Sequence, residues 1–472
     1  MNIITDQDAR SDHKTFPAIF VAVALIFGTI LVFLTPPFQV TDEFWHFFRA
    51  YQISLGEMVA QKQDDTQGGT LPLSLLTLSN RFARLPYHPA QRTSWTEIVD
   101  AGKIPLEPGR PFFFHFPSTA NYSPLVYAPQ AIAIAIGRWA GLRPLELLYF
   151  AREANLLAYC IAGYFTLRFA PALKRAIFIV MLMPMSLSLA ASVSADAVTI
   201  AICLLFTSLV WDCAVDDAAK VDARNKIAII ALSIGVVLCK FAYAPLILLV
   251  LLIPASRFGG KGRRLKFVAA LIIVNLAVSL AWLSQTAGAG LIIRPDRPDV
   301  NAAQQLAFIR GHPLALLPAL ARGFTHDGPL ILQSFVGYLG WLDNPVSPLV
   351  VAIYLIVLAA ACWPIVNDPP PLPRWRLTLL AALVFACVLI FAFLNYLFWT
   401  PVGFPQLQGL QGRYFIPLGL AMLILAWGIL RRSPKLIPPL NNSIKLDVIA
   451  SALCICGGFY TLFLVFTRYF AS

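Results

Sequence analysis

Long apolar runs, separated by polar gaps, cover most of the chain. A helix of about 20 apolar residues crosses the hydrocarbon core of a bilayer, and it satisfies its own backbone hydrogen bonds there. The pattern therefore predicts an all-α polytopic membrane protein with roughly 11–13 transmembrane helices. The predicted spans lie at about 16–36, 124–141, 147–168, 174–192, 196–212, 226–240, 241–254, 267–285, 347–366, 377–398, 413–430 and 446–467.

Two long polar segments interrupt these spans, at 37–123 and 286–346. Connections of this length are usually functional, so we expect both segments to carry functional residues. Lys and Arg collect in cytoplasmic loops, and the basic cluster at 257–266 therefore predicts a loop inside the cell. Counting spans alternately from that loop places 286–346 and the C-terminus outside, and 37–123 is expected to be external too. We treat 1–472 as a single transmembrane domain with two long external loops, 37–123 and 286–346.

The topology of residues 124–212 leaves alternatives open. The basic residues near 168–175 favour the inside, and one of the runs 124–141 and 147–168 must then cross incompletely. The stretch 226–254 is interpreted as two short helices, in preference to one long helix kinked before Pro245.

Composition agrees with the membrane prediction. The chain is 58% hydrophobic and 13% charged, with a mean hydropathy of +0.71. Its net charge of +12 does not indicate nucleic acid, because Lys and Arg lie mostly in the gaps between apolar runs. The eight cysteines lack metal-ligand spacing with histidines, which predicts neither a disulfide framework nor a zinc site. A Gly-rich phosphate loop and an HExxH motif are missing from the sequence, which disfavours ATP-driven transport and metalloprotease chemistry.

The first candidate site follows the first span. If residues 42–51 form a helix, Asp42, His46 and Arg49 share one face, and the aromatic side chains Phe44, Phe47, Phe48 and Tyr51 share the other. The segment is therefore predicted to be an amphipathic interfacial helix with Thr41 as its N-cap. A carboxylate beside a dry cavity can act as a general base, which makes Asp42 and Glu43 the catalytic candidates. The alternative is an ordinary helix start with a salt bridge to Arg49.

Other candidates are ionisable or polar groups at the ends of spans, where burial is expensive. Lys240 could bind a phosphate or extend to lipid headgroups. Arg413 could bind a phosphate or pyrophosphate of a substrate, or only the phosphate of a membrane lipid. Arg152 and Glu153, inside an apolar run, are expected to pair with each other. The full set of residues expected to bind substrate is His46, Arg49, Asn121, Tyr122, Asp196, Lys240, Tyr243, Trp341, Asp343, Gln411, Arg413 and Tyr414.

Five blocks of sequence together resemble the DUF2142 family of bacterial multipass membrane proteins. Thr41, directly before the first block, departs from the family pattern, which often has proline at this position. The blocks are DE-x-x-H-F-x-R-A-Y at 42–51, N-Y-x-P-L-x-Y-x-P-Q at 121–130, K-x-x-Y-x-P-L at 240–246, G-x-L-G-W-L-D at 337–343 and Q-G-R-Y-F-x-P at 411–417.

The resemblance implies a branch of the GT-C superfamily of membrane glycosyltransferases, with amphipathic juxtamembrane helices in the first external loop. It implies an inverting transfer on the periplasmic face of the bacterial inner membrane, from a polyprenyl-phosphate-linked sugar to a surface glycan or lipid acceptor. Asp42 matches the acid/base position, with Glu43 beside it. Lys240, Arg413 and Arg49 are the cations expected at the donor phosphate. No cofactor or metal is expected to be required, although a divalent cation at Asp42 and Glu43 is left open.

Two other classes of function remain open from the sequence. A flippase or exporter of lipid-linked saccharides would need the same phosphate site without forming a glycosidic bond. A scaffold in a polysaccharide assembly complex would leave the external ionisable residues without a role. Membrane lipids are expected partners in every case.

Overall fold

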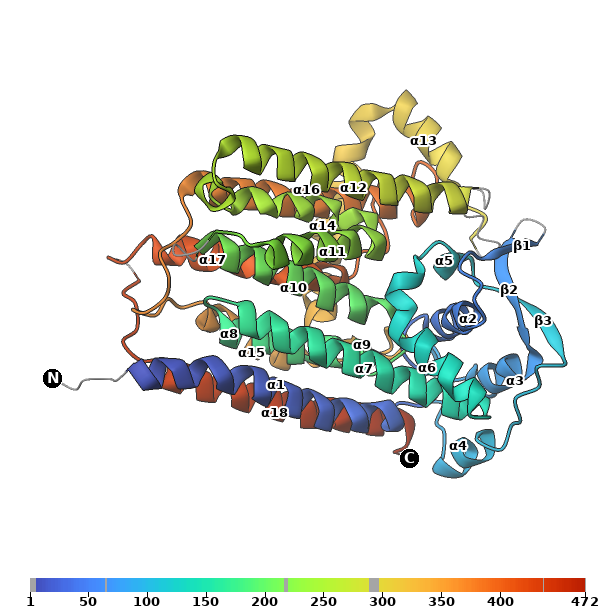
Figure 1. The fold of residues 1–472 in the computed structure, drawn as a ribbon. Helices are drawn as coiled ribbons and strands as arrows, with labels where there is room; N and C mark the ends of the chain where they lie inside the picture. Colours follow the sequence, from blue (N-terminus) through green and yellow to red (C-terminus); the bar gives the residue numbers. More distant parts are fainter. Residues whose placement is uncertain (1–5, 64–65, 216–219, 288–296, 436, 472) are drawn as a thin grey trace.

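The computed structural model describes residues 6–63, 66–215, 220–287, 297–435 and 437–471. In these residues, helices with roughly aligned axes form a bundle, and a small cap of short helices and strands covers one end of it (Figure 1). The 3₁₀ helices are labelled η.

Six helical segments of the described chain are long and apolar enough to cross a membrane, which confirms an all-α polytopic membrane protein. They belong to α1 (Asp6–Leu34), α10 (Ala195–Val215), α12 (Lys261–Ala287), α16 (Arg374–Phe398), η4 (Gly412–Leu418) with α17 (Gly419–Arg431), and α18 (Ile444–Tyr469).

The remaining predicted spans form α7, which has 26 residues, and several shorter helices. Proline divides some of these runs. The run 174–192 splits before Pro184, since proline cannot donate the backbone hydrogen bond that would continue the helix. Two short helices form within 226–254 and meet at Lys240, as predicted. These elements are α7 (Pro144–Phe169), α8 (Lys174–Leu182), α9 (Pro184–Ala190), α11 (Ala223–Cys239), η2 (Phe241–Leu252), η3 (Ala255–Phe258) and α15 (Pro348–Ala361).

The run 124–141 forms η1 (Pro124–Tyr127) and α6 (Ala128–Trp139). The 12 residues of α6 extend about 18 Å at 1.5 Å per residue, well short of the roughly 30 Å hydrocarbon core. One of the runs 124–141 and 147–168 was expected to cross incompletely. Helix α6, in the first run, is the shorter of the two, since α7 in the second run has 26 residues.

The first polar segment builds the cap. It contains an antiparallel sheet in the order β1-β2-β3, which the sequence pattern did not predict, together with the juxtamembrane helix α2. The β2 strand contains Gly68, where an added Cβ would lie 1.7 Å from the carbonyl oxygen of Phe114, so the close strand contact requires glycine. The elements are α2 (Glu43–Ser54), β1 (Gln61–Gln63), β2 (Thr66–Pro72), α3 (Leu73–Phe82), α4 (Trp95–Ala101), β3 (Pro111–His115) and α5 (Pro117–Ala120).

The C-terminal end of α18 packs against this cap. The Thr93 amide donates to the carbonyl of Tyr469 over 2.9 Å, and the rings of Trp95 and Phe470 stack with centroids 4.4 Å apart. The N-terminal end of α1 lies at the opposite end of the bundle (Figure 1). The cap and the C-terminus therefore lie on the same side, in agreement with the alternating topology expected from the charges.

The second polar segment contributes a helix to the bundle as well as a loop; its residues 288–296 lie outside the described chain. Helix α14 packs on η4, where the amide of Gly412 donates to Ser334 Oγ over 2.7 Å. The segment thereby positions the turn that carries Arg413. Its elements are α13 (Ala302–Gly311), α14 (Pro313–Val336), β4 (Tyr338–Leu339) and β5 (Asn344–Pro345).

Candidate functional site

Asp42 lies immediately before α2 in the left-handed conformation, with φ of 64°. The predicted N-cap was wrong, because the Thr41 hydroxyl donates to the carbonyl of Gly340 over 2.8 Å and Asp42 takes the N-cap position. Asp42 makes no side-chain cap hydrogen bond. Non-glycine residues pay about 1 kcal/mol or more for this backbone conformation, and Asp is among those that adopt it most readily. The Asp42 carboxylate instead lies 3.5 Å from Arg413 Nη2.

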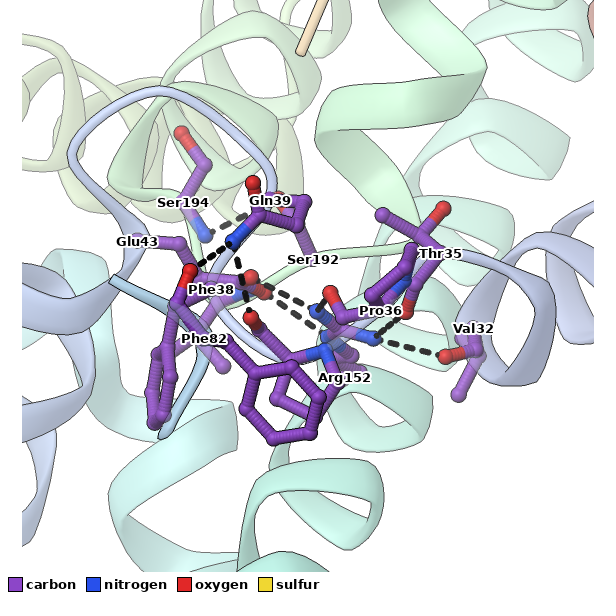
Figure 2. Close-up of polar contacts among 12 residues, drawn as sticks. Val32, Thr35, Pro36, Phe38, Gln39, Glu43, Phe82, Arg152, Ser192 and Ser194 are labelled. Carbon is purple, nitrogen blue, oxygen red and sulfur yellow. Dashed lines mark hydrogen bonds and ion pairs between the residues drawn. The ribbon is translucent and has the colours of Figure 1, made fainter. Parts of the chain in front are cut away.

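Glu43 has a different environment from its neighbour. Its fully buried carboxylate accepts hydrogen bonds from Arg152 Nε at 2.8 Å and Nη2 at 2.6 Å (Figure 2). It also accepts a hydrogen bond from the Val193 amide at 3.1 Å. Arg152 also donates to the carbonyls at the end of α1, those of Val32, Thr35 and Pro36. This geometry gives Glu43 a structural position that joins α1, α2, α7 and the turn before α10.

Arg152 therefore pairs with Glu43, and the expected pair with Glu153 is wrong. Glu153 instead accepts a hydrogen bond from the Thr29 hydroxyl over 3.3 Å. Burial explains why Arg152 pairs with Glu43. A fully buried guanidinium needs a partner that can satisfy several donors at once, and the Glu43 carboxylate accepts two of them.

Four charged residues, here called the charge cluster, meet beside α2: Asp42, Asp196, Lys240 and Arg413. Lys240 Nζ donates to Asp196 Oδ1 over 2.7 Å. Arg413 lies between the two carboxylates, with Nε 3.7 Å from Asp196 Oδ2 and Nη2 3.5 Å from Asp42 Oδ2. The sequence placed all four among the candidate residues, and the fold brings them together from four separate segments.

Local structure explains each position. Asp196 is in the first turn of α10, where the helix dipole favours a carboxylate. Lys240 has extended backbone, with φ −157° and ψ 126°, at the break between α11 and η2. Arg413 follows Gly412, at which an added Cβ would lie 2.0 Å from the carbonyl oxygen of Ile331 in α14. Only glycine permits η4 to approach α14 this closely.

Aromatic side chains surround the two cations. Lys240 Nζ lies 5.6 Å from the ring centroid of Tyr122 and 5.1 Å from that of Tyr414, and the Arg413 guanidinium lies 5.4 Å from the Tyr414 ring. Rings at these distances stabilise a desolvated cation. The Tyr243 hydroxyl donates to the Tyr414 carbonyl over 2.8 Å and so fixes that turn.

His46 lies on the same side of α2. Its ring stacks on Tyr122 with centroids 6.0 Å apart, and Nδ1 is 2.7 Å from the Tyr127 hydroxyl. Burial lowers the pKa of His46 to about 3; the nearby Asp196 carboxylate opposes this, and the Arg413 and Lys240 cations add to it. The imidazole is therefore neutral near pH 7.

Other predicted residues lie outside the charge cluster. Arg49 donates to Gln52 Oε1 and to the Met58 carbonyl, both over 2.6 Å, so it neither faces Asp42 nor pairs with it. Asp343 accepts from Arg468 Nη2 over 2.7 Å and from the Trp341 amide over 3.0 Å, which is a structural arrangement. Arg468, the partner of Asp343, was not predicted as a site residue; it stands one position after the predicted span 446–467.

The positions of Asn121 and Gln411 flank the cluster. The Asn121 carbonyl accepts a hydrogen bond from the Trp282 indole over 3.0 Å. The side-chain oxygens Asn121 Oδ1 and Gln411 Oε1 are buried and make no hydrogen bond within the described residues. Tyr127, the partner of His46, was not predicted as a site residue, although it stands in the same block as Tyr122.

Two cavities adjoin this region. The first, of about 1160 Å³, is here called the aromatic cleft, and its wall includes Asp42, Phe44, Trp45, Tyr87 and Trp341. The second, of about 820 Å³, is here called the apolar groove, and residues of α6, α11 and α12 line most of it, with the end of α2. Among the described residues, no group of three His, Cys, Asp or Glu side chains could hold a metal ion.

Comparison with known proteins places the chain in a family. No curated protein and no solved structure matches the chain. Residues 25–423 match the family described as predicted membrane protein DUF2142. This range contains the whole charge cluster and the Glu43–Arg152 pair. The chain therefore belongs to the DUF2142 family of predicted membrane proteins.

Proposed function

We propose that this protein is a membrane glycosyltransferase. It moves a sugar from a polyprenyl-phosphate-linked donor to a surface glycan or lipid acceptor, with inversion, on the periplasmic face of the bacterial inner membrane. Arg413 carries the proposal: its side chain is only 7% exposed, and it lies 3.5 Å or more from both carboxylates that pair with it.

The guanidinium of Arg413 has unused capacity for an anion. Its Nε makes no hydrogen bond within the described residues. A buried guanidinium presents a planar set of donors that matches a phosphate, and it stays charged. Lys240, held at 2.7 Å by Asp196, adds a second fixed cation. This arrangement supports binding of the donor phosphate and stabilisation of the charge that develops on it as the sugar leaves.

The apolar groove supports a lipid-linked donor. Its wall includes Ser123, which follows Tyr122 in the chain, and the Tyr122 ring lies 5.6 Å from Lys240 Nζ. A polyprenyl chain in this groove would bring its phosphate toward the two cations. Such a donor also needs no nucleotide-binding loop.

Asp42 is the proposed general base. Its carboxylate is 32% exposed, far more than Asp196 at 12%, and it lines the aromatic cleft. In the proposed step, the acceptor hydroxyl loses its proton to Asp42 as its oxygen attacks the anomeric carbon. The bond from that carbon to the phosphate oxygen breaks, and the electron pair leaves with polyprenyl phosphate. Arg413 then faces a phosphate with a larger negative charge.

The phosphate site is tested with purified protein in lipid nanodiscs and a panel of polyprenyl-phosphate sugars. Mass spectrometry follows donor loss and product, and a separate titration with polyprenyl phosphate measures binding. Arg413→Ala is expected to weaken binding at least tenfold, since a charged hydrogen bond contributes about 1.5–3 kcal/mol. Arg322→Ala, which removes an exposed arginine of α14, is the control and is expected to bind like wild type.

The results separate the two candidate functions. A new glycoside formed from one donor supports the transferase. Binding that depends on Arg413 without turnover of any donor would exclude the transferase and favour a flippase. Binding that is unchanged in Arg413→Ala would contradict the proposed phosphate site.

A further inference from the structure

Residues of α2, α3 and β3, together with Trp341 from the turn between β4 and β5, line the aromatic cleft. Elements α2, α3 and β3 belong to the cap at one end of the bundle (Figure 1). The cleft's volume of about 1160 Å³ exceeds the roughly 300–1,000 Å³ typical of small-ligand pockets. The cleft therefore has room for a ligand of several sugar rings.

Aromatic faces form one wall. The rings of Trp341 and Phe44 stack with centroids 5.5 Å apart, and the Tyr87 ring meets Trp341 edge-on at 5.7 Å. Tyr87 is 65% exposed and has a φ of 61°. A bulky residue in this conformation costs about 1–3 kcal/mol, and such residues concentrate at binding sites. Sugar rings have apolar C–H faces that pack on aromatic rings of this kind.

The polar part of the wall is mostly uncharged. Among the lining residues that the structure describes, Asp42 and Arg297 are the only acidic and basic side chains, apart from two histidines, and Arg297 lies over the ring of Trp399, 5.8 Å from its centroid. The other polar groups are amides and hydroxyls, such as those of Gln39, Ser79 and Asn80. Amides and hydroxyls suit the hydroxyls of a neutral sugar, whereas an anionic polymer would need more cations.

A lipid acceptor fits this wall less well. A hydrocarbon chain would leave the cleft's amides and hydroxyls without water or hydrogen-bond partners, which is costly. The apolar groove, by contrast, has few polar side chains and suits a hydrocarbon chain. The two cavities therefore differ in the chemistry that they accept.

We propose that the aromatic cleft binds a neutral oligosaccharide, and that this oligosaccharide is the acceptor. The role as acceptor rests on the proposed function, whereas the binding rests on the cleft alone. The hydrogen bond from Thr41 to Gly340 joins the residues next to Asp42 and Trp341 over 2.8 Å. A sugar stacked on the aromatic wall thereby presents a hydroxyl to the Asp42 carboxylate.

The test measures binding without a donor. Neutral tetrasaccharides of glucose, mannose and galactose are titrated against protein in nanodiscs, with tetragalacturonate as the anionic comparator. Tryptophan fluorescence and saturation-transfer NMR report binding. At least one neutral tetrasaccharide is expected to bind more tightly than tetragalacturonate, and Tyr87→Ala is expected to weaken it at least about fivefold by removing a ring contact. Trp139→Ala, which removes a 90% exposed aromatic side chain outside the cleft, is expected to bind like wild type.

Three outcomes would overturn the assignment: no neutral tetrasaccharide binds, tetragalacturonate binds more tightly, or Tyr87→Ala binds as wild type does. Because Tyr87 is largely exposed, its replacement leaves the core intact, and unchanged thermal unfolding confirms this. Oligosaccharide binding in a protein that transfers no sugar would retain the cleft assignment and remove the proposed transferase.

Discussion

At the scale of single residues, the adjacent carboxylates of Asp42 and Glu43 have opposite environments. Glu43 is fully buried and receives two hydrogen bonds from Arg152, whereas Asp42 lines a cleft and lies 3.5 Å from Arg413. Asp42 has a left-handed backbone, with φ of 64°, and Glu43 is the first residue of α2. Of these two carboxylates, Asp42 is therefore the one to which we assign the role of general base in the proposed transfer.

The structural position of Glu43 predicts a large effect on stability. Glu43→Gln leaves the buried Arg152 cation without its counter-charge, and breaking a buried pair costs about 3–5 kcal/mol. Glu97→Gln is a matched control, because Glu97 also receives two hydrogen bonds from one arginine, Arg84, but at the protein surface. The control should cost at most about 1 kcal/mol. Thermal unfolding in detergent measures both, and equal losses would contradict the structural position of Glu43.

The buried His46 predicts a pH dependence of stability. Its pKa is about 3 in the folded protein and near the ordinary 6.5 in the unfolded chain. Below pH 6.5 the unfolded chain binds a proton that the folded protein does not, so stability falls as the pH drops toward 3. The loss from this residue is about 2 kcal/mol at pH 5.

The variant His46→Gln removes this titration and keeps a hydrogen-bonding side chain. Between pH 7 and pH 5, it should lose about 2 kcal/mol less stability than wild type in denaturant unfolding followed at both pH values. Comparing the two proteins removes the contribution of the other titrating groups, because that contribution is the same in both. An identical pH dependence of the two proteins would be inconsistent with a neutral buried imidazole.

At the scale of secondary-structure elements, the contact between η4 and α14 sets the position of Arg413. Gly412→Ala would place a methyl group 2.0 Å from the Ile331 carbonyl oxygen and 2.2 Å from the Phe335 amide nitrogen, and backbone atoms cannot move aside cheaply. The turn must shift, at a cost of about 1–3 kcal/mol, and Arg413 moves with it.

Gly419→Ala is the matched control, since its new methyl group would meet only a side-chain carbon of Val180 at an ordinary 3.4 Å. We expect polyprenyl phosphate to bind at least about fivefold more weakly to Gly412→Ala than to Gly419→Ala, as judged by titration in nanodiscs. If both variants bind like wild type, the contact does not control the position of Arg413.

Sequence reasoning predicted the elements unevenly. The apolar runs identified the long spans, because length and hydrophobicity alone decide whether a helix can cross a bilayer. The break at Pro184 and the shortness of α6 were harder to see, since apolar composition continues through both. The sheet of the cap was missed because β2 is rich in glycine, Thr66–Pro72 reading TQGGTLP, and carries little strand signal.

At the scale of the whole molecule, the candidate site depends on contacts between distant segments. Asp42, Asp196, Lys240 and Arg413 could each be identified because ionisable residues at the ends of apolar runs are rare and costly. The distances between these four side chains could not be predicted, since they depend on how α10, α11 and η4 pack. The same limit applies to Arg49, whose guanidinium donates to the carbonyl of Met58 in the loop after α2, a contact that the helical spacing of 42–51 could not reveal.

The most direct measurement compares wild type, Asp42→Asn and Asp100→Asn in the transfer assay, with donor binding measured in parallel. Asp100→Asn is the control, because Asp100 is a surface carboxylate of the same cap, 2.7 Å from Lys103 Nζ. The account predicts that Asp42→Asn binds polyprenyl phosphate and unfolds like wild type, yet forms product at least 100-fold more slowly, as the loss of a general base implies. Transfer by Asp42→Asn at the wild-type rate would contradict it.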